Sequence, residues 1–210
     1  MSRVIITLVV VFVPLPALAQ TAGQPLSQTQ CSLTVAESPA IRGLKLGLSA
    51  EQLLSLFPGS LERPEIKNAI DNAQGSPNYG VARLSFRSSA YSSTFRDRFT
   101  GVDSIDVELF DGKVARFRVT YLGPLTSPRG PRWPNVDGFI ARLSEAFALP
   151  DPENWNYVSS DFKTLKCNGF EIRASNPNAS GSILFSTAFE KTAWQRAEAE
   201  EERRRREFKP

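Results

Sequence analysis

The chain has 210 residues, 41% of them hydrophobic, with 25 basic and 22 acidic side chains and a formal net charge of +3. This length suits one large or two small domains, and so balanced a charge gives no reason to expect nucleic acid as a partner. The sequence contains no histidine, which excludes Ser-His-Asp and Cys-His catalysis, histidine metal ligands and histidine pH switches, so we expect no metal and no cofactor.

Residues 1–19 are predicted to be a secretory signal peptide. Arg3 precedes an apolar run at residues 4–13, and Ala17 and Ala19 form a small-residue cleavage pattern. The alternative is a membrane anchor, but the run is shorter than the about 20 apolar residues that span a bilayer. We therefore expect a periplasmic or secreted protein with no membrane span after signal cleavage.

Residues 20–38 are polar and are predicted to be a linker leading into an α+β domain at residues 39–189. The two cysteines of an exported protein usually pair. We therefore predict a disulfide between Cys31 and Cys167, which would tie the linker to the domain. Two buried free thiols are the alternative.

A short helix is predicted within GLKLGLSAEQLLSLFPG, residues 43–59. Ser49 stands three residues before Gln52, which is the spacing of a capping box, and a Pro-Gly pair ends the helix. A phosphate-binding loop is the alternative reading. It would need lysine after the second glycine, whereas Gly47 is followed by Leu48. The glycines therefore indicate tight backbone geometry before a helix.

Alternation of apolar and polar residues predicts strands at residues 81–87, 104–110 and 114–121. The last two are joined at Asp111-Gly112, which is a hairpin signal.

The register of that hairpin follows from matching the apolar faces. A two-residue loop would place Ile105 opposite Arg118, an apolar residue against a charged one. A three-residue loop with a left-handed Gly112 places Val107 opposite Ala115, and we predict that register.

The second half repeats this order of elements. A helix is predicted at residues 136–149, a two-residue hairpin turns on Asn168-Gly169 with Leu165 opposite Ile172, and residues 182–187 form a further strand. Helix, three strands, helix and three strands predict an antiparallel sheet with helices packed on one face, in a twofold αβββ arrangement.

Residues 190–210 are predicted to be a charged helical tail. Glutamates 200–202 precede arginines 204–206 by four positions, the favourable order for ion pairs within a helix. We expect Trp194 to dock the start of the tail on the domain. Arginines 203–206 are a weaker candidate for contact with anionic envelope polymers.

Residues 46–53, LGLSAEQL, resemble a helix-opening motif of the form apolar-Gly-apolar-Ser/Thr-x-x-x-apolar. It is found in a group of small exported bacterial proteins that includes the small lipoprotein of the outer-membrane assembly machine and the β-lactamase inhibitor protein. The resemblance implies a short helical part paired with a sheet, and a binding module rather than an enzyme. The lipid-anchor cysteine of the assembly lipoprotein is missing from this sequence.

Two loops and the segment after the second helix carry Tyr, Trp and Arg, the residue types that dominate binding hot spots. The candidate binding surface consists of Tyr91, Phe95, Arg96, Arg129, Arg132, Trp133, Trp155 and Tyr157. The alternative is that Trp133 and Trp155 lie in the core at the ends of the second helix, because aromatic side chains bury large areas.

We expect a non-catalytic exported protein that binds another protein or an envelope component. One competing hypothesis is an envelope hydrolase that uses carboxylates such as Asp103, Asp106 and Glu108. A hydrolase would bring two acidic residues from separate elements into one pocket. The other is a structural protein acting through its C-terminal helix. The sequence leaves the oligomeric state open.

Overall fold

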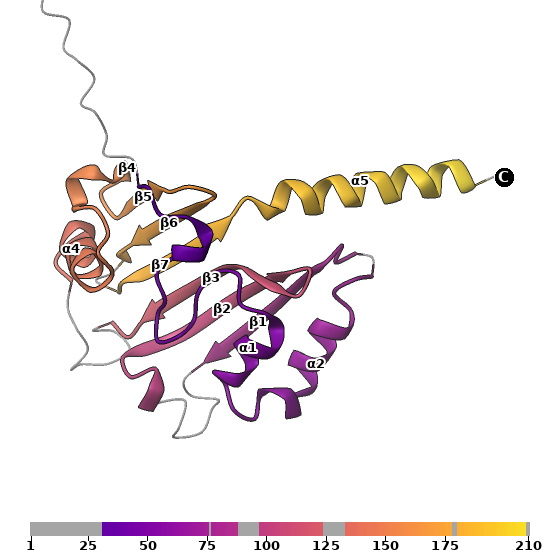
Figure 1. The fold of residues 1–210 in the computed structure, drawn as a ribbon, viewed down its shortest axis with the longest axis horizontal. Coiled ribbons are helices and arrows are strands. Elements are labelled where there is room, and N and C mark those ends of the chain that lie inside the picture. Colours follow the sequence, from indigo (N-terminus) through magenta and orange to yellow (C-terminus); the bar gives the residue numbers. More distant parts are fainter. Residues whose placement is uncertain (1–30, 76, 88–96, 124–132, 178–179, 209–210) are drawn as a thin grey trace, which may run out of the picture.

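A computed structural model describes residues 31–75, 77–87, 97–123, 133–177 and 180–208. The predicted signal peptide lies outside these residues. The described residues form an antiparallel seven-stranded sheet in the order β1-β2-β3-β7-β6-β5-β4, with helices beside it (Figure 1). The predicted α+β class with an antiparallel sheet is confirmed.

The helices are α1 Ala50–Ser55, α2 Pro64–Asp71, α4 Val136–Phe147 and α5 Phe189–Glu207. The strands are β1 Val81–Arg87, β2 Val102–Phe110, β3 Lys113–Tyr121, β4 Asn156–Ser159, β5 Phe162–Lys166, β6 Phe170–Ser175 and β7 Ser182–Thr187. α2 and β4 were not predicted, so the twofold αβββ arrangement is wrong: two helices and three strands are followed by one helix and four strands. α4 ends two residues early, because Ala148 takes a left-handed conformation with φ 51°.

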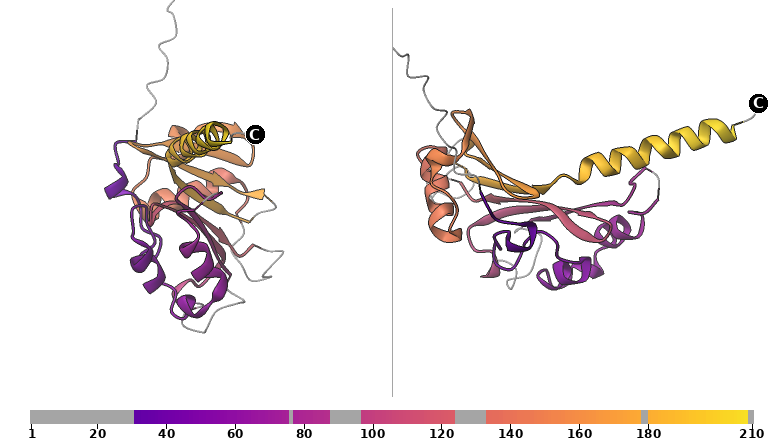
Figure 2. Two further views of the ribbon diagram at one scale, coloured as in Figure 1. Left: turned by 90° about the vertical axis from the view of Figure 1, so that its right-hand side faces the viewer. Right: turned by 45° about the horizontal axis from the view of Figure 1, so that its top comes forward.

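Helices α1, α2 and α4 contribute to one core on one face of the sheet. Leu53 of α1 and Phe139 of α4 belong to the same buried cluster as Phe117 and Phe185 of the sheet. Phe189, the first residue of α5, joins a separate cluster with Val81 and Ala115. Figure 2 shows α5 leaving the domain on the side of the sheet opposite α1 and α2. We call that opposite side the open face.

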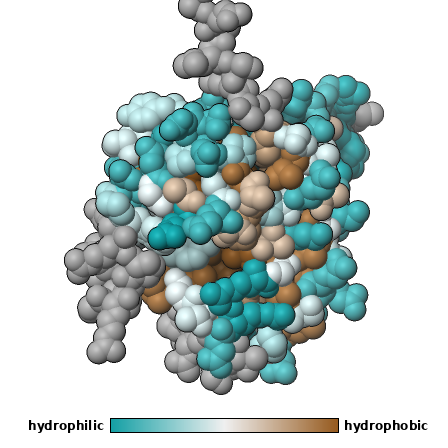
Figure 3. Space-filling model, turned by 60° about the vertical axis from the view of Figure 1, so that its left-hand side comes forward, coloured by the Kyte–Doolittle hydropathy of each residue, from teal (hydrophilic) through white to brown (hydrophobic). Residues whose placement is uncertain are grey.

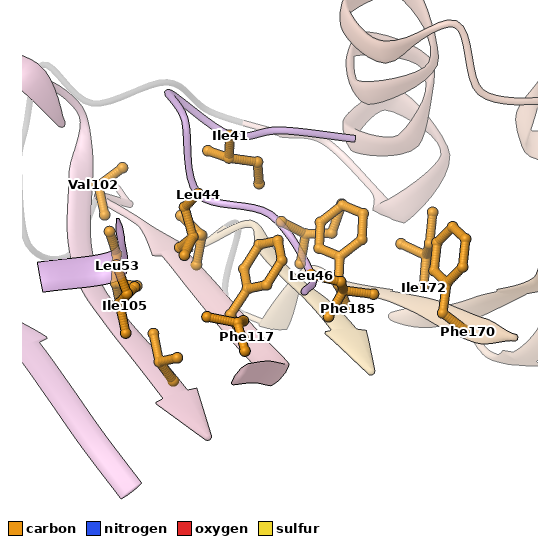
Figure 4. Packing of buried hydrophobic residues seen from close by; sticks show 14 of the residues in the cluster. Ile41, Leu44, Leu46, Leu53, Val102, Ile105, Phe117, Phe170, Ile172 and Phe185 are labelled. Atoms are coloured by element: carbon orange, nitrogen blue, oxygen red, sulfur yellow. The ribbon is translucent and has the colours of Figure 1, made fainter. Parts of the chain in front are cut away.

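The sheet contributes to the core through apolar side chains that recur at about every second position along the strands (Figure 4). Phe117 on β3 stacks on Phe185 on β7, with ring centroids 4.7 Å apart. Phe57, just after α1, stacks on Phe86 of β1 at 3.8 Å. The Phe117–Phe185 contact joins the two halves of the chain, because β3 and β7 are neighbours at the centre of the sheet.

The capping box that begins α1 is confirmed. The Ser49 hydroxyl accepts a hydrogen bond from the Gln52 backbone N–H at 3.1 Å, and the Gln52 side chain accepts one from the Ser49 N–H at 2.9 Å. Gly47, with φ 81°, donates its N–H to the Val114 carbonyl at 2.8 Å. The glycine therefore brings the backbone of this segment onto β3.

The predicted register of the first hairpin is wrong. Asp111 and Gly112 form a two-residue turn with φ 50° and 75°, as two-residue hairpins of the primed type require. A β-bulge at Ala115 then shifts the pairing, so Val107 lies opposite Phe117 rather than Ala115. One extra residue reverses the side-chain parity. The bulge thus allows a two-residue turn and still places apolar residues of β2 and β3 opposite one another. The predicted left-handed conformation of Gly112 is confirmed.

The second hairpin has the predicted register, with Leu165 opposite Ile172. Cys167, at its turn, is bonded to Cys31, as predicted. The Asn168 N–H also donates to the Leu33 carbonyl at 2.9 Å. Residues 31–38, the last part of the predicted linker, therefore pack on the domain, and residues 20–30 lie outside the described part of the chain.

Candidate binding face

Five residues of the predicted binding surface lie outside the described part of the chain: Tyr91, Phe95, Arg96, Arg129 and Arg132.

The two tryptophans of that surface are interior residues. Trp155 is only 4% exposed and donates its indole N–H to the Pro150 carbonyl at 3.0 Å. Trp133 is half-buried and packs edge-on against Phe139 of α4, with centroids 5.3 Å apart. Tyr157 is exposed on the edge strand β4. The three described residues therefore do not form one surface, because the tryptophans fill the region around α4.

Other large apolar side chains are exposed at separate places, namely Leu61, Val158, Trp194 and Phe208. A band of hydrophobic residues also reaches the surface between two hydrophilic zones on the side shown in Figure 3. The four exposed side chains come from the segment between α1 and α2, from β4, and from α5 and its end. They therefore do not outline a common apolar docking surface.

The open face carries two parallel rows of side chains that cross six strands, and all but one of these side chains are polar. The strand pairing places one residue of each strand in each row. The first, which we call the paired row, is Arg83, Glu108, Arg116, Ser186, Glu171 and Lys166. The second, which we call the arginine row, is Ser85, Asp106, Arg118, Leu184, Arg173 and Thr164.

Charges in the paired row largely satisfy one another. Arg116 donates to Glu108 at 3.1 Å and to the Ser186 hydroxyl at 3.1 Å, and it also forms an ion pair with Glu190 of α5. Arg83 lies 3.6 Å from Glu108. Such a network holds its side chains in place and leaves few donors for a ligand.

The arginine row is less balanced. Arg118 and Arg173 stand on either side of Leu184, which is 7% exposed although it points away from the main core. The hollow here has a volume of about 310 Å³ and is lined by Asp106, Glu108, Arg116, Arg118, Arg173 and Leu184. Leu184 is buried because long arginine stems can cover an apolar residue while their charged ends reach water.

One end of the open face is occupied by the start of α5. The Phe189 ring lies 5.6 Å from Phe110, and the Arg116 guanidinium lies 5.2 Å over Phe189. Arg196 donates two hydrogen bonds of 2.8 Å to the Asp111 carboxylate, which lowers the pKa of Asp111. Docking by Trp194 is therefore wrong, because its side chain is 61% exposed.

The three carboxylates considered for a hydrolase, Asp103, Asp106 and Glu108, all lie on β2. Asp106 and Glu108 line one hollow. A neighbouring hollow of about 400 Å³ contains Glu171 of β6 and Glu190 of α5, which do come from separate elements. Each is engaged by an arginine, Glu171 by Arg173 at 2.7 Å and Glu190 by Arg116.

The arginines that line the open face were missed from the sequence, although each one had a signal. Arg116, Arg118 and Arg173 occupy polar positions of predicted strands, next to core residues. Alternation indicates that such side chains share the outer side of a sheet. Alternation does not predict that β7 lies between β3 and β6. That strand order is what places Arg118 and Arg173 on either side of Leu184.

No protein-family model matches this chain, and no curated protein or solved structure matches it at a significant level. Among the described residues, none of the helices combines the length and the apolar character needed to cross a membrane. Across the same residues, no group of three or more acidic, cysteine or histidine side chains is arranged to hold a metal ion.

Proposed function

We propose that this chain is a non-catalytic exported protein that binds another protein through the open face of its sheet. The observation that carries the proposal is the position of the helices. Three of them pack on one face, and only the first two turns of α5 dock on the other. The rest of the open face presents ordered charged rows, and such a rigid surface limits the entropy lost when a partner binds.

Two further observations support the proposal. The disulfide between Cys31 and Cys167 suits an oxidising compartment such as the periplasm. The resemblance of residues 46–53 to small exported binding domains also favours an exported binding protein.

The test is site-specific photo-crosslinking in a native envelope fraction. One variant carries the photoreactive residue at Thr120, on the open face beside the arginine row. A matched variant carries it at Arg142, an exposed residue of α4 on the other side of the sheet. We expect Thr120 to crosslink one discrete protein and Arg142 to crosslink none. No protein captured from Thr120, or the same set from both positions, would contradict the proposal.

A second candidate function is a structural protein that acts through α5. The observation that favours it is the exposed Trp194 on a helix that extends away from the domain (Figure 1). A third crosslinking variant at Trp194 separates the two. Capture from Trp194 alone would move the partner site to α5.

A further inference from the structure

We propose that the arginine row recognises a carboxylate of the partner protein. The carboxylate would sit between Arg118 and Arg173, and an apolar side chain beside it would contact Leu184. This inference rests on the proposed function, and it names the chemistry that the open face selects.

The strand pairing sets the two arginines at a suitable separation. Arg118 on β3 and Arg173 on β6 are both directly opposite Leu184 on β7. Neighbouring strands lie about 4.8 Å apart, so the two arginine backbones are roughly 10 Å apart. Long side chains rooted at that distance on the same face can converge on a single carboxylate.

The donors of these arginines are largely unused. Within the part of the chain that the structure describes, the Arg118 side chain makes no hydrogen bond or ion pair, although Asp106 is its cross-strand neighbour. The Asp106 carboxylate instead accepts a 2.8 Å hydrogen bond from the Ser85 hydroxyl. Arg173 uses its Nε toward Glu171, which leaves the two Nη groups for another acceptor. Guanidinium forks with free N–H groups bind carboxylates in a bidentate manner.

The surrounding charges favour one carboxylate over a polyanion. The open face also carries four acidic side chains, Asp106, Glu108, Glu171 and Glu190. They are interspersed with the five basic side chains of the two rows, so the face offers no continuous basic track for closely spaced phosphates. A protein surface of mixed charge needs no such track and can place a single acidic group over the arginines. Charge complementarity therefore points to a protein partner.

Leu184 adds an apolar component to the site. It forms the floor of the hollow between the two arginines, beneath their stems. A ligand side chain that displaces those stems would bury both itself and Leu184, and hot spots commonly combine an apolar contact with a charged rim. The site therefore selects an acidic residue next to an aliphatic one.

The test uses a capped Leu-Glu-Leu peptide as the probe and nuclear magnetic resonance as the readout. We expect saturable shifts of the Arg118 and Arg173 Nε–H signals and of the Leu184 methyl signals. Capped Leu-Gln-Leu should bind about tenfold more weakly, because the charge-assisted hydrogen bonds are lost. Capped Leu-phosphoserine-Leu tests the alternative that the row is a phosphate site.

Arg118→Gln and Arg173→Gln should each weaken Leu-Glu-Leu binding about tenfold. Arg83→Gln on the paired row and Arg142→Gln on α4 should leave it unchanged. The same spectra verify that each variant is folded. The inference is overturned by equal binding of the glutamine peptide, tighter binding of the phosphoserine peptide, unchanged binding to Arg118→Gln, or no saturable shift up to about 10 mM peptide.

The two proposals fail separately. If Thr120 crosslinks a protein but the peptide does not bind, the carboxylate site is wrong and the protein-binding function stands. If the peptide binds but Thr120 crosslinks nothing, the site is a carboxylate pocket and the proposed function is wrong.

Discussion

At the scale of single residues, close packing against α4 leaves no room for a side chain at Gly181. A Cβ added there would lie 2.5 Å from the Phe139 ring. The Gly181 carbonyl also accepts a hydrogen bond from the Tyr121 N–H at 2.9 Å, so the backbone cannot easily move away. This glycine is needed for the approach of α4 to the sheet.

Gly181→Ala should therefore destabilise the protein by about 1 to 3 kcal/mol, the usual cost of overpacking a core. Urea denaturation measures the difference. Gly75→Ala is the matched control, because an added Cβ there meets only the Asn72 carbonyl oxygen at 3.9 Å. A stability loss that is the same for both variants would contradict the packing argument.

The side chain of Ser49 stabilises α1 by satisfying the Gln52 N–H, which has no partner within the helix. Ser49→Ala should cost about 1 kcal/mol in thermal or urea unfolding. Ser55→Ala in the same helix should cost less, because the Ser55 hydroxyl bonds only to the carbonyl of Gln52. ATP should not change the melting temperature, and a saturable increase would show that the Gly-rich segment binds phosphate after all.

At the scale of elements, α5 has two parts that differ in their contacts. Its first two turns dock through Phe189 and Arg196. Beyond Ala199 the ion pairs of the described residues are internal to the helix, including the predicted i,i+4 pair of Glu200 with Arg204 at 3.1 Å. Exposed pairs of this kind contribute about 0.3 to 0.5 kcal/mol each. The far part therefore adds little to the stability of the domain.

A chain that ends at Ala199 should unfold at nearly the same urea concentration as the full chain. A chain that ends at Ala188 should lose about 2 to 4 kcal/mol, because it lacks the buried Phe189 ring and the Arg196–Asp111 pair. Equal stability of the two truncated chains would show that docking of α5 does not stabilise the domain.

The pair of Arg196 with Asp111 makes the docking of α5 sensitive to acid. Because Arg196 lowers the pKa of Asp111 in the folded state, the pair stabilises the protein above the carboxyl's ordinary pKa of about 3.9. That contribution is lost as the pH falls through the lower pKa of the folded state.

The difference in melting temperature between the wild type and Arg196→Gln should therefore shrink as the pH is lowered from about 6 to about 2. Lys191→Gln removes a similar charge from an exposed position of α5 and serves as the control. The Arg196 guanidinium also lies 4.7 Å over the Phe110 ring. A difference that does not change with pH would mean that Arg196 acts only through this packing.

At the scale of the whole molecule, the disulfide joins the first described residue to the β5–β6 hairpin across 136 positions. The bond closes residues 31–167 into one loop, and β6, β7 and α5 follow it in the chain. In the chain-entropy argument, a loop of this length stabilises the folded state by about 4 to 5 kcal/mol.

Replacing both Cys31 and Cys167 with serine should lower the free energy of unfolding by about 2 to 5 kcal/mol. Thiol titration of the denatured, unreduced mature protein should find no free cysteine. Two free thiols, or a serine double variant as stable as the wild type, would contradict the role of the bond.

The sequence by itself determined the features that depend on neighbours within a few positions. The Ser49 capping box, the Asn168-Gly169 turn and the Glu200–Arg204 pair each involve residues at most four apart. Alternation along the strands also indicated which side chains face the core, because the side-chain period of a strand is two. These signals were enough for the α+β class and the antiparallel sheet.

Only the tertiary structure decided how these elements meet. The Ala115 bulge, the pairing of β3 with β7, and the burial of Trp155 depend on contacts between distant segments. A period of two assigns each arginine to a face, but it does not name the strand beside it. Arg118 and Arg173 flank Leu184 because β3 and β6 both pair with β7. Those pairings depend on packing across the whole core, which a short stretch of sequence does not reveal.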